Sequence, residues 1–136
     1  MIDGMAHVCI GSTDLEATER FYCEGLGCEK VFDFIREGEV VGFYLRIADA
    51  NFVEVFLQEE IDAEAPAPIS HLCLEVSDID GVAERLASKG YEVTEKKLGA
   101  DRSWQVWTSD PCGVRIEFHQ YTGDSSQVTG ADCRLD

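Results

Sequence analysis

Two histidines and two glutamates occupy matching places in the two halves of the chain, and their side chains are those of a metal site. His71 follows His7 by 64 residues. Glu117 follows Glu54 by 63 residues. Each lies in a short apolar segment, where a carboxylate is costly unless it is paired or bound to a cation. Two imidazoles and two carboxylates suit Zn²⁺, Ni²⁺, Co²⁺, Mn²⁺ or Fe²⁺ and leave further positions for water or substrate. We therefore predict that one divalent transition metal is bound by these four residues.

The matching places belong to a repeat. Residues 5–15 (MAHVCIGSTDL) resemble residues 69–79 (ISHLCLEVSDI), with His, Cys and Asp in register. Further matches follow in the same order, one of them between residues 52–56 and residues 115–119. A single strand glutamate is usually solvated and a lone histidine is usually structural. Agreement of several stretches in one register instead indicates duplication, which makes the four residues one site.

Each half predicts a strand, a helix and three further strands, so the fold class is α+β with two tandem βαβββ modules. The first helix is expected to begin with the capping-box pattern of Thr13 and Glu16 and to end at Gly25 or Gly27. The second is expected to begin at Ser77 or Asp78 and to end at Gly90. The expected strands cover residues 6–10, 29–35, 40–47, 52–57, 71–76, 91–97, 104–108 and 114–121.

These elements divide the chain into modules at residues 1–58 and 70–121. The acidic segment 59–69 contains prolines and is expected to link them. Hydrophobic periodicity is lost after Thr122, so residues 122–136 are expected to form a flexible tail.

The net charge of −16 excludes whole classes of partner. Such a field repels phosphate backbones and anionic lipids, so we expect no nucleic-acid or membrane partner. No apolar run approaches the roughly 20 residues that span a bilayer, and no secretory signal is recognised, which favours a cytoplasmic protein. The six cysteines have no C-x-x-C pair and are expected to be free and mostly buried thiols.

Further site residues follow from strand alternation, because residues i and i+2 share one face of a strand. Phe56 and Gln58 share the face of Glu54, and His119 shares the face of Glu117. Since the repeat counterpart of His119 is Phe56, His119 breaks the symmetry and has either an acid–base role or an indirect role at the metal. Trp104 and Trp107 form either an aromatic wall of the substrate cavity or ordinary core packing. The residues expected to bind substrate are Phe56, Gln58, Arg102, Trp104, Trp107 and His119.

The sequence resembles the vicinal oxygen chelate superfamily from Ala6 to Tyr121. This superfamily includes glyoxalase I, fosfomycin-resistance proteins, methylmalonyl-CoA epimerase, bleomycin-resistance proteins and extradiol dioxygenases. Cys112 departs from the usual D-P-D-G turn. The motifs that carry the resemblance are His7, Asp14-Leu15, Phe21-Tyr22, Leu26-Gly27, Val53-Glu54-Val55, His71-Leu72 and Asp110-Pro-Cys-Gly113-Val-Arg-Ile116-Glu117.

The resemblance implies that the modules form a curved, open mixed sheet around one metal, and that the protein is a homodimer. Members hold the oxygens of a small substrate on the metal and stabilise an oxyanion, often an enolate. Glu54 completes the order His-Glu-His-Glu of bacterial-type glyoxalase I. The resemblance therefore implies a lactoylglutathione lyase type of reaction, with Glu117 as the base that moves a proton between adjacent carbons and Glu54 as its counterpart.

Two residues depart from the glyoxalase I pattern, so the resemblance does not identify the substrate. Gly11 stands where glyoxalase I typically has an arginine that binds the glutathione carboxylate, and Gln58 stands where asparagine is typical. A glutathione or other thiol adduct would then need another cation, namely Arg46, Arg102 or Arg115. An epimerase or extradiol-type dioxygenase remains an alternative. A non-catalytic small-molecule binding or resistance protein is another, although such binders generally lack the metal set.

Overall fold

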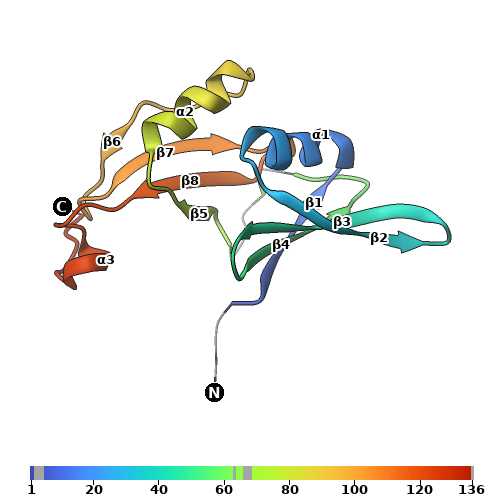
Figure 1. The fold of residues 1–136 in the computed structure, drawn as a ribbon, viewed down its shortest axis with the longest axis horizontal. Coiled ribbons are helices and arrows are strands. Elements are labelled where there is room, and N and C mark those ends of the chain that lie inside the picture. Colours follow the sequence, from blue (N-terminus) through green and yellow to red (C-terminus); the bar gives the residue numbers. More distant parts are fainter. Residues whose placement is uncertain (2–4, 63, 66–68, 136) are drawn as a thin grey trace. The chain divides into compact units, whose positions relative to one another are not determined.

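In the computed structural model the chain forms two compact units (Figure 1). The structure describes every residue except 2–4, 63, 66–68 and 136. Unit 1 comprises Met1–Pro66 together with the turn Asp110–Gly113, and unit 2 comprises Ala67–Ser109 and Val114–Asp136. The division expected from the sequence, with modules at residues 1–58 and 70–121, places this turn in the second module. No helix in the described part of the chain is long and apolar enough to cross a membrane.

Unit 1 is a four-stranded mixed sheet with one helical segment on one face, which confirms the expected βαβββ order (Figure 1). Its strand order is β1-β4-β3-β2, in which β1 and β4 are parallel and the other pairs are antiparallel. Buried residues of β3 and β4, such as Leu45 and Val55, face the helical segment and form the core. The elements are β1 (His7–Ser12), α1 (Leu15–Glu19), η1 (Arg20–Gly25), β2 (Glu29–Arg36), β3 (Glu39–Ala48) and β4 (Asn51–Leu57).

Unit 2 repeats this arrangement with strand order β5-β8-β7-β6, again with one parallel pair, β5 and β8. The strand expected at residues 91–97 is wrong, because only Lys97–Leu98 pairs with β7 and the preceding segment is irregular. One reason is that the Oγ1 atom of Thr94 accepts a hydrogen bond from the backbone N–H of Trp107, which takes the place of a regular ladder bond. The elements are β5 (Leu72–Glu75), α2 (Ile79–Ser88), β6 (Lys97–Leu98), β7 (Trp104–Ser109), β8 (Arg115–Gln120) and α3 (Ser126–Thr129).

Both main helices begin at an aspartate. The carboxylate of Asp14 accepts a hydrogen bond from the backbone N–H of Ala17 at 3.0 Å, and that of Asp78 accepts one from Gly81 at 3.0 Å. The expectation that Thr13 caps the first helix is therefore wrong by one residue. The reason is that a carboxylate also interacts favourably with the positive end of the helix dipole.

The first helix does not continue as an α-helix but widens into the π-helical segment η1. A π-turn is wider than an α-turn and changes which residues face the sheet. Two successive aromatic residues, Phe21 and Tyr22, are both fully buried here. The helical spacing read from the sequence did not predict this change.

The last residues are more ordered than the expected flexible tail. Ser125 is fully buried, and its hydroxyl donates a hydrogen bond to the carbonyl oxygen of Arg102 at 3.0 Å. The backbone N–H of Ser126 donates to the carbonyl oxygen of Asp101 at 2.9 Å. Hydroxyl groups and α3 thus attach residues 122–129 to the turn before β7, and such contacts leave no hydrophobic period in the sequence.

Candidate metal centre

Each unit carries one histidine–glutamate pair on its parallel strands, in the same register. In unit 1, Cys9 of β1 lies opposite Glu54 of β4. In unit 2, Cys73 of β5 lies opposite Glu117 of β8. In both units the histidine precedes that cysteine by two residues and so shares its face of the sheet. The duplication read from the sequence is therefore also a duplication of geometry.

The pair in unit 1 lies on the face opposite the helix. The Nε2 atom of His7 is 3.3 Å from Oε2 of Glu54, and the Glu54 side chain is 20% exposed. The hydroxyl group of Tyr44 lies 3.4 Å from Nδ1 of His7 and restrains the imidazole ring. One ring nitrogen is thus directed to the carboxylate and the other to a phenol.

The pair in unit 2 repeats this contact with the same atoms. The Nε2 atom of His71 is 3.3 Å from Oε2 of Glu117, whose side chain is only 9% exposed. The indole ring of Trp107 packs edge-on against the His71 ring, with centroids 4.9 Å apart. Trp107 therefore lies beside the candidate ligands, on the face where the sequence placed it.

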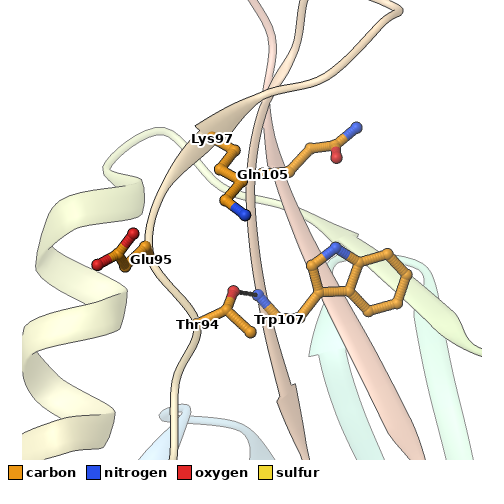
Figure 2. A pocket seen from close by; sticks show the side chains of 5 residues that line it. All are labelled: Thr94, Glu95, Lys97, Gln105 and Trp107. Carbon is orange, nitrogen blue, oxygen red and sulfur yellow. Dashed lines mark hydrogen bonds between the residues drawn. The ribbon is translucent and has the colours of Figure 1, made fainter.

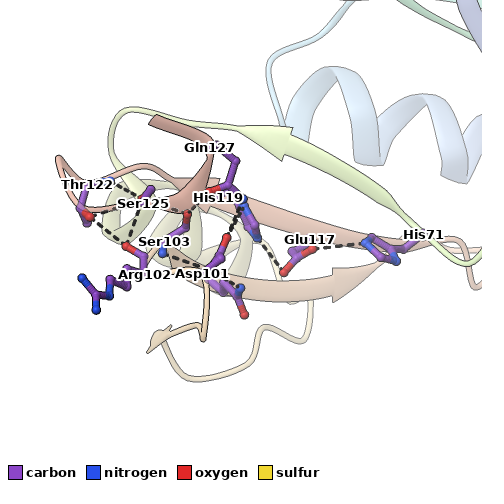
Figure 3. A network of polar contacts seen from close by, with 10 residues as sticks. His71, Asp101, Arg102, Ser103, Glu117, His119, Thr122, Ser125 and Gln127 are labelled. Carbon is purple, nitrogen blue, oxygen red and sulfur yellow. Dashed lines mark hydrogen bonds and ion pairs between the residues drawn. The ribbon is translucent and has the colours of Figure 1, made fainter. Parts of the chain in front are cut away.

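His119 approaches Glu117 from the other side, and Figure 3 shows the carboxylate between the two imidazole rings. Its Nε2 atom is 2.9 Å from Oε1 of Glu117, without the geometry of a hydrogen bond. Its Nδ1 atom is 3.8 Å from Oδ2 of Asp101. Burial raises the pKa of Asp101, but hydrogen bonds from Gln127 and Ser103 and the nearby His119 lower it more, so the net pKa is depressed. Asp101 is thus held as an anion behind His119.

The duplicated cysteines lie beside the two carboxylates. Burial, followed by the charge and hydrogen bond of Glu117, raises the pKa of the Cys73 thiol to about 12. Burial and Glu54 also raise the pKa of Cys9. All six cysteines are unpaired, but the expectation that they are mostly buried is wrong, because three are exposed and three are partly exposed.

Five aromatic side chains cover the open face of unit 1 next to the His7–Glu54 pair. Phe32 stacks on Tyr44 with ring centroids 4.8 Å apart, and Tyr44 stacks on Phe52 at 5.2 Å. Only Phe56 among them was expected from the sequence, because the pairing of β2, β3 and β4 is needed to show that the others share its face. We call the following set the aromatic surface: Phe32, Phe34, Tyr44, Phe52 and Phe56.

Gln58 is exposed, and its side-chain amide lies against Gly11 of β1. A Cβ atom placed on Gly11 would meet the side-chain amide of Gln58 at 2.6 Å. The glycine therefore leaves the space that the Gln58 amide fills. Gly11 and Gln58, the two departures from the glyoxalase I pattern, are thus in contact and form a single local change.

Two of the expected substrate residues lie elsewhere. Trp104 alternates with Trp107 to the opposite face of β7, beneath the Nζ atom of Lys96 at 5.1 Å, so the two tryptophans do not form one wall. Arg102 lies in a turn with φ of 64°, and Figure 3 shows its side chain directed away from Glu117. Trp104 and Trp107 are three residues apart, and an odd spacing puts two side chains on opposite faces of a strand.

A pocket of about 320 Å³ opens beside Trp107 in unit 2 (Figure 2). Its walls come from β6, β7 and the irregular segment before β6, where Thr94 is hydrogen-bonded to Trp107. The volume is at the lower end of the range for small-molecule sites. The lining residues are Thr94, Glu95, Lys97, Gln105 and Trp107.

The turn Asp110–Gly113 belongs to unit 1 through its contacts with the first helical segment. The hydroxyl of the buried Tyr22 donates a hydrogen bond to Oδ2 of Asp110 at 3.0 Å. The Sγ atom of Cys112 accepts a hydrogen bond from the backbone N–H of Thr13 at 3.3 Å. Burial raises the pKa of Cys112, but hydrogen bonds from Ser12, Thr13 and Thr18 lower it more, so its net pKa is below the usual value.

The donor atoms of the two pairs fit a divalent transition metal. Bonds of about 2.0–2.2 Å put two ligands of one ion about 3–4 Å apart, which is the separation within each pair. Glu117 is buried, and within the described part of the chain no lysine or arginine forms an ion pair with it or with Glu54. A buried carboxylate without a cationic partner is stabilised by a bound cation.

A family model described as the glyoxalase/bleomycin resistance protein/dioxygenase superfamily matches residues 6–108. The chain belongs to this superfamily, as the resemblance indicated. A comparison with curated protein sequences gives no match.

Solved structures show the same fold. A glyoxalase family protein from Enterococcus faecalis is 24% identical, with a TM-score of 0.74 over 86% of this chain and 97% of that one. A lactoylglutathione lyase from Agrobacterium tumefaciens is 22% identical, with a TM-score of 0.67 over 88% of this chain and 94% of that one. An antibiotic-binding protein from a Streptomyces species is 21% identical, with a TM-score of 0.72 over 89% of this chain and 98% of that one.

Proposed function

We propose that the protein is a metal-dependent lyase or isomerase of the glyoxalase I type, acting on a small substrate with two adjacent oxygens. His7, Glu54, His71 and Glu117 together would hold one divalent transition metal. The observation that carries the proposal is the repeated pair, with Nε2 and Oε2 atoms 3.3 Å apart in both units. Two such pairs supply the four ligands that neither unit has alone.

When bound, the metal would supply positive charge that stabilises an enolate as it develops on the substrate. Glu117 is the residue that would carry the proton between adjacent carbons. It is more enclosed than Glu54, with 9% against 20% of the side chain exposed, and water competes less for an enclosed base. His119 lies on the far oxygen of Glu117 and would hold the carboxylate in one orientation.

The part of the substrate that does not react would occupy the pocket beside Trp107. Lys97 lines that pocket and offers a cation for a carboxylate, which Arg102 does not. We therefore propose a glutathione or other thiol adduct as the substrate class. Its carboxylate would be bound differently from the glyoxalase I pattern, because Gly11 stands where the carboxylate-binding arginine is typical and Gln58 stands where asparagine is typical. We also propose that the protein is a cytoplasmic homodimer.

The direct test is turnover of methylglyoxal with glutathione by metal-free protein to which Zn²⁺, Ni²⁺ or Co²⁺ is added in turn. We expect activity with at least one metal and a loss of at least about 100-fold in Glu54→Gln and Glu117→Gln, since each removes a charged ligand or base. Glu16→Gln makes the same chemical change at an exposed helical residue and should retain full activity. Absence of turnover with every metal and with other thiol adducts would contradict the proposal.

The aromatic surface favours a second candidate, a protein that binds a planar small molecule without transforming it. Stacking on aromatic rings is worth about 0.5–1.5 kcal/mol per pair beyond area burial. Quenching of Tyr44 fluorescence is masked by tryptophan, so the test is calorimetric titration with planar aromatic compounds. Tight binding that needs Phe32 and Phe52 but persists in Glu117→Gln, together with no turnover, would favour the binder over the enzyme.

A further inference from the structure

Three potential ligand atoms gather on the open face of unit 2, one from Glu117 and two from residues outside the ligand set already considered. The Cys73 thiol, the Glu117 carboxylate and the His119 imidazole each offer one atom, and these atoms lie within 4.8 Å of one another. Ligands on one ion with bonds of about 2.0–2.3 Å are spaced within that limit. All three residues belong to the parallel strands β5 and β8, so the backbone of unit 2 alone positions them.

The inner ring nitrogen of His119, Nε2, lies 2.9 Å from Oε1 of Glu117 but makes no hydrogen bond. Its side chain is buried, with 8% of the residue exposed. Among the buried side-chain atoms that the structure describes, Nε2 of His119 is the one without a hydrogen-bond partner. A buried polar atom in this state is costly, because it has lost its hydrogen bonds to water and has not gained another. The nitrogen is directed at Glu117, where a bound cation would satisfy both groups (Figure 3).

The outer nitrogen of His119 faces a carboxylate that is itself held in place. Asp101 Oδ2 is 3.8 Å from Nδ1, and the amide of Gln127 donates a hydrogen bond to that same oxygen at 2.7 Å. The backbone N–H of Ser103 donates to the other oxygen of Asp101 at 3.1 Å. Histidines that bind metals commonly have a carboxylate behind the ring, which sets its orientation and raises its basicity.

We propose that Cys73, Glu117 and His119 form a second metal site, selective for a thiolate-accepting ion such as Zn²⁺ or Co²⁺. Sulfur, nitrogen and carboxylate oxygen are the ligands that these ions share, whereas Mg²⁺ and Ca²⁺ prefer oxygen alone. Three protein ligands leave one position for water. The thiol proton is released to solvent when the sulfur binds, so the ion is held by two negative charges and a neutral imidazole.

The site goes beyond the proposed function, because it needs no residue of unit 1. Glu117 has one oxygen near each histidine, with Oε2 towards His71 and Oε1 towards His119. The carboxylate therefore serves the proposed reaction through one oxygen and the thiolate site through the other. Bridging carboxylates of this kind would couple the two ions, so filling the thiolate site fixes the orientation of Glu117.

Unit 1 provides an internal comparison. Cys9 and Glu54 occupy the places of Cys73 and Glu117, but Phe56 stands where unit 2 has His119. The Phe56 ring stacks on Phe34 with centroids 4.5 Å apart and offers no ligand atom. The third ligand is therefore present in one half of the duplication only.

The test is titration of metal-free, reduced full-length protein with Co²⁺, followed in the near-ultraviolet region where thiolate-to-cobalt charge transfer absorbs. We expect this band to appear in the natural protein and to be lost in Cys73→Ser. In His119→Phe, which copies unit 1, the apparent affinity for Co²⁺ should fall by about 10-fold or more. Cys9→Ser is the matched control and should keep the band at full intensity.

Two further results separate this site from the proposed enzyme. His7→Ala should abolish thiol-adduct turnover and leave the charge-transfer band unchanged, so either idea can fail without the other. Zinc-edge X-ray absorption on the unaltered protein should show a zinc–sulfur shell at about 2.3 Å, which does not depend on any variant folding. A missing band and a missing sulfur shell in the natural protein, or a band that persists in Cys73→Ser, would overturn the proposal.

Discussion

Glu117 has polar side chains on several sides. It is buried, lies between two imidazole rings and stands opposite a thiol across the parallel strands. Its counterpart Glu54 has a phenylalanine in place of the second imidazole and is more exposed. The two glutamates are therefore equivalent in position but not in environment, and this difference assigns the proton-transfer role to Glu117 in our proposal.

At the residue scale, the two histidine–glutamate pairs could be found in the sequence because each of their residues has a counterpart in the other half of the chain. The residues of the aromatic surface have no identical residues at the matching places in the other half of the chain. Phe32 and Tyr44 have ordinary core residue types, and only the β2–β3 pairing shows that they share a face. The same holds for Asp101, which is joined to His119 through a turn and not through strand spacing.

Cys112 should react faster with alkylating reagents than Cys28 and Cys73. Its pKa is lowered, whereas burial raises the pKa of Cys28 to about 11 and that of Cys73 to about 12. A lower pKa leaves more thiolate at a given pH, and the thiolate is the nucleophile. Alkylation with iodoacetamide between pH 7 and 8.5, followed by peptide mass spectrometry, should modify Cys112 well before Cys28 and Cys73. Equal rates at all three sites would contradict this assignment of the thiolate.

At the scale of elements, the βαβββ order could be predicted because strand and helix periods were both clear. The exceptions share a physical reason, since side-chain hydrogen bonds replaced hydrophobic contacts. Thr94 replaces a ladder bond before β6, and Ser125 fastens the segment around α3. Such bonds depend on residues that are distant in sequence and leave no periodic pattern.

The turn Asp110–Gly113 should contribute to stability through the π-helical segment η1. In Tyr22→Phe the buried Asp110 loses the hydrogen bond from the phenol, which should cost about 1–3 kcal/mol of unfolding free energy. Urea denaturation measures this difference. Tyr121→Phe, at a more exposed position, is the control and should change stability by no more than about 0.5 kcal/mol. Equal effects of the two variants would show that the Asp110 contact contributes nothing.

At the scale of the whole molecule, each of the two units carries one histidine–glutamate pair of the proposed ligand set. The sequence predicts that the four ligands act together but cannot predict whether one chain or two supply them, because both arrangements use the same residues. The family to which the chain belongs follows from motifs that cover both units. The substrate does not follow from these motifs, since the pocket beside Trp107 is lined by the irregular segment before β6.

Mixing two inactive variants tests how the ligand set is completed in the proposed homodimer. His7→Ala and His71→Ala should each be inactive in thiol-adduct turnover. If two chains share each site, a mixed dimer contains one site with both substitutions and one site with none, and activity returns to about a quarter of the natural level at equal mixing. Sedimentation analysis checks that the variants are dimers. Dimeric variants that exchange subunits but regain no activity on mixing would instead show that each chain completes its own site.

The most direct measurement is calorimetric titration with Zn²⁺ in a Cys73→Ser background, which removes the proposed thiolate site. Our account predicts one binding event per chain. Substitution of His7 by alanine and of His71 by alanine should each weaken this same event by at least about 100-fold, because each removes one ligand of one ion. Two independent events, of which His7→Ala removes one and His71→Ala the other, would contradict the claim that the duplicated pairs bind a single metal.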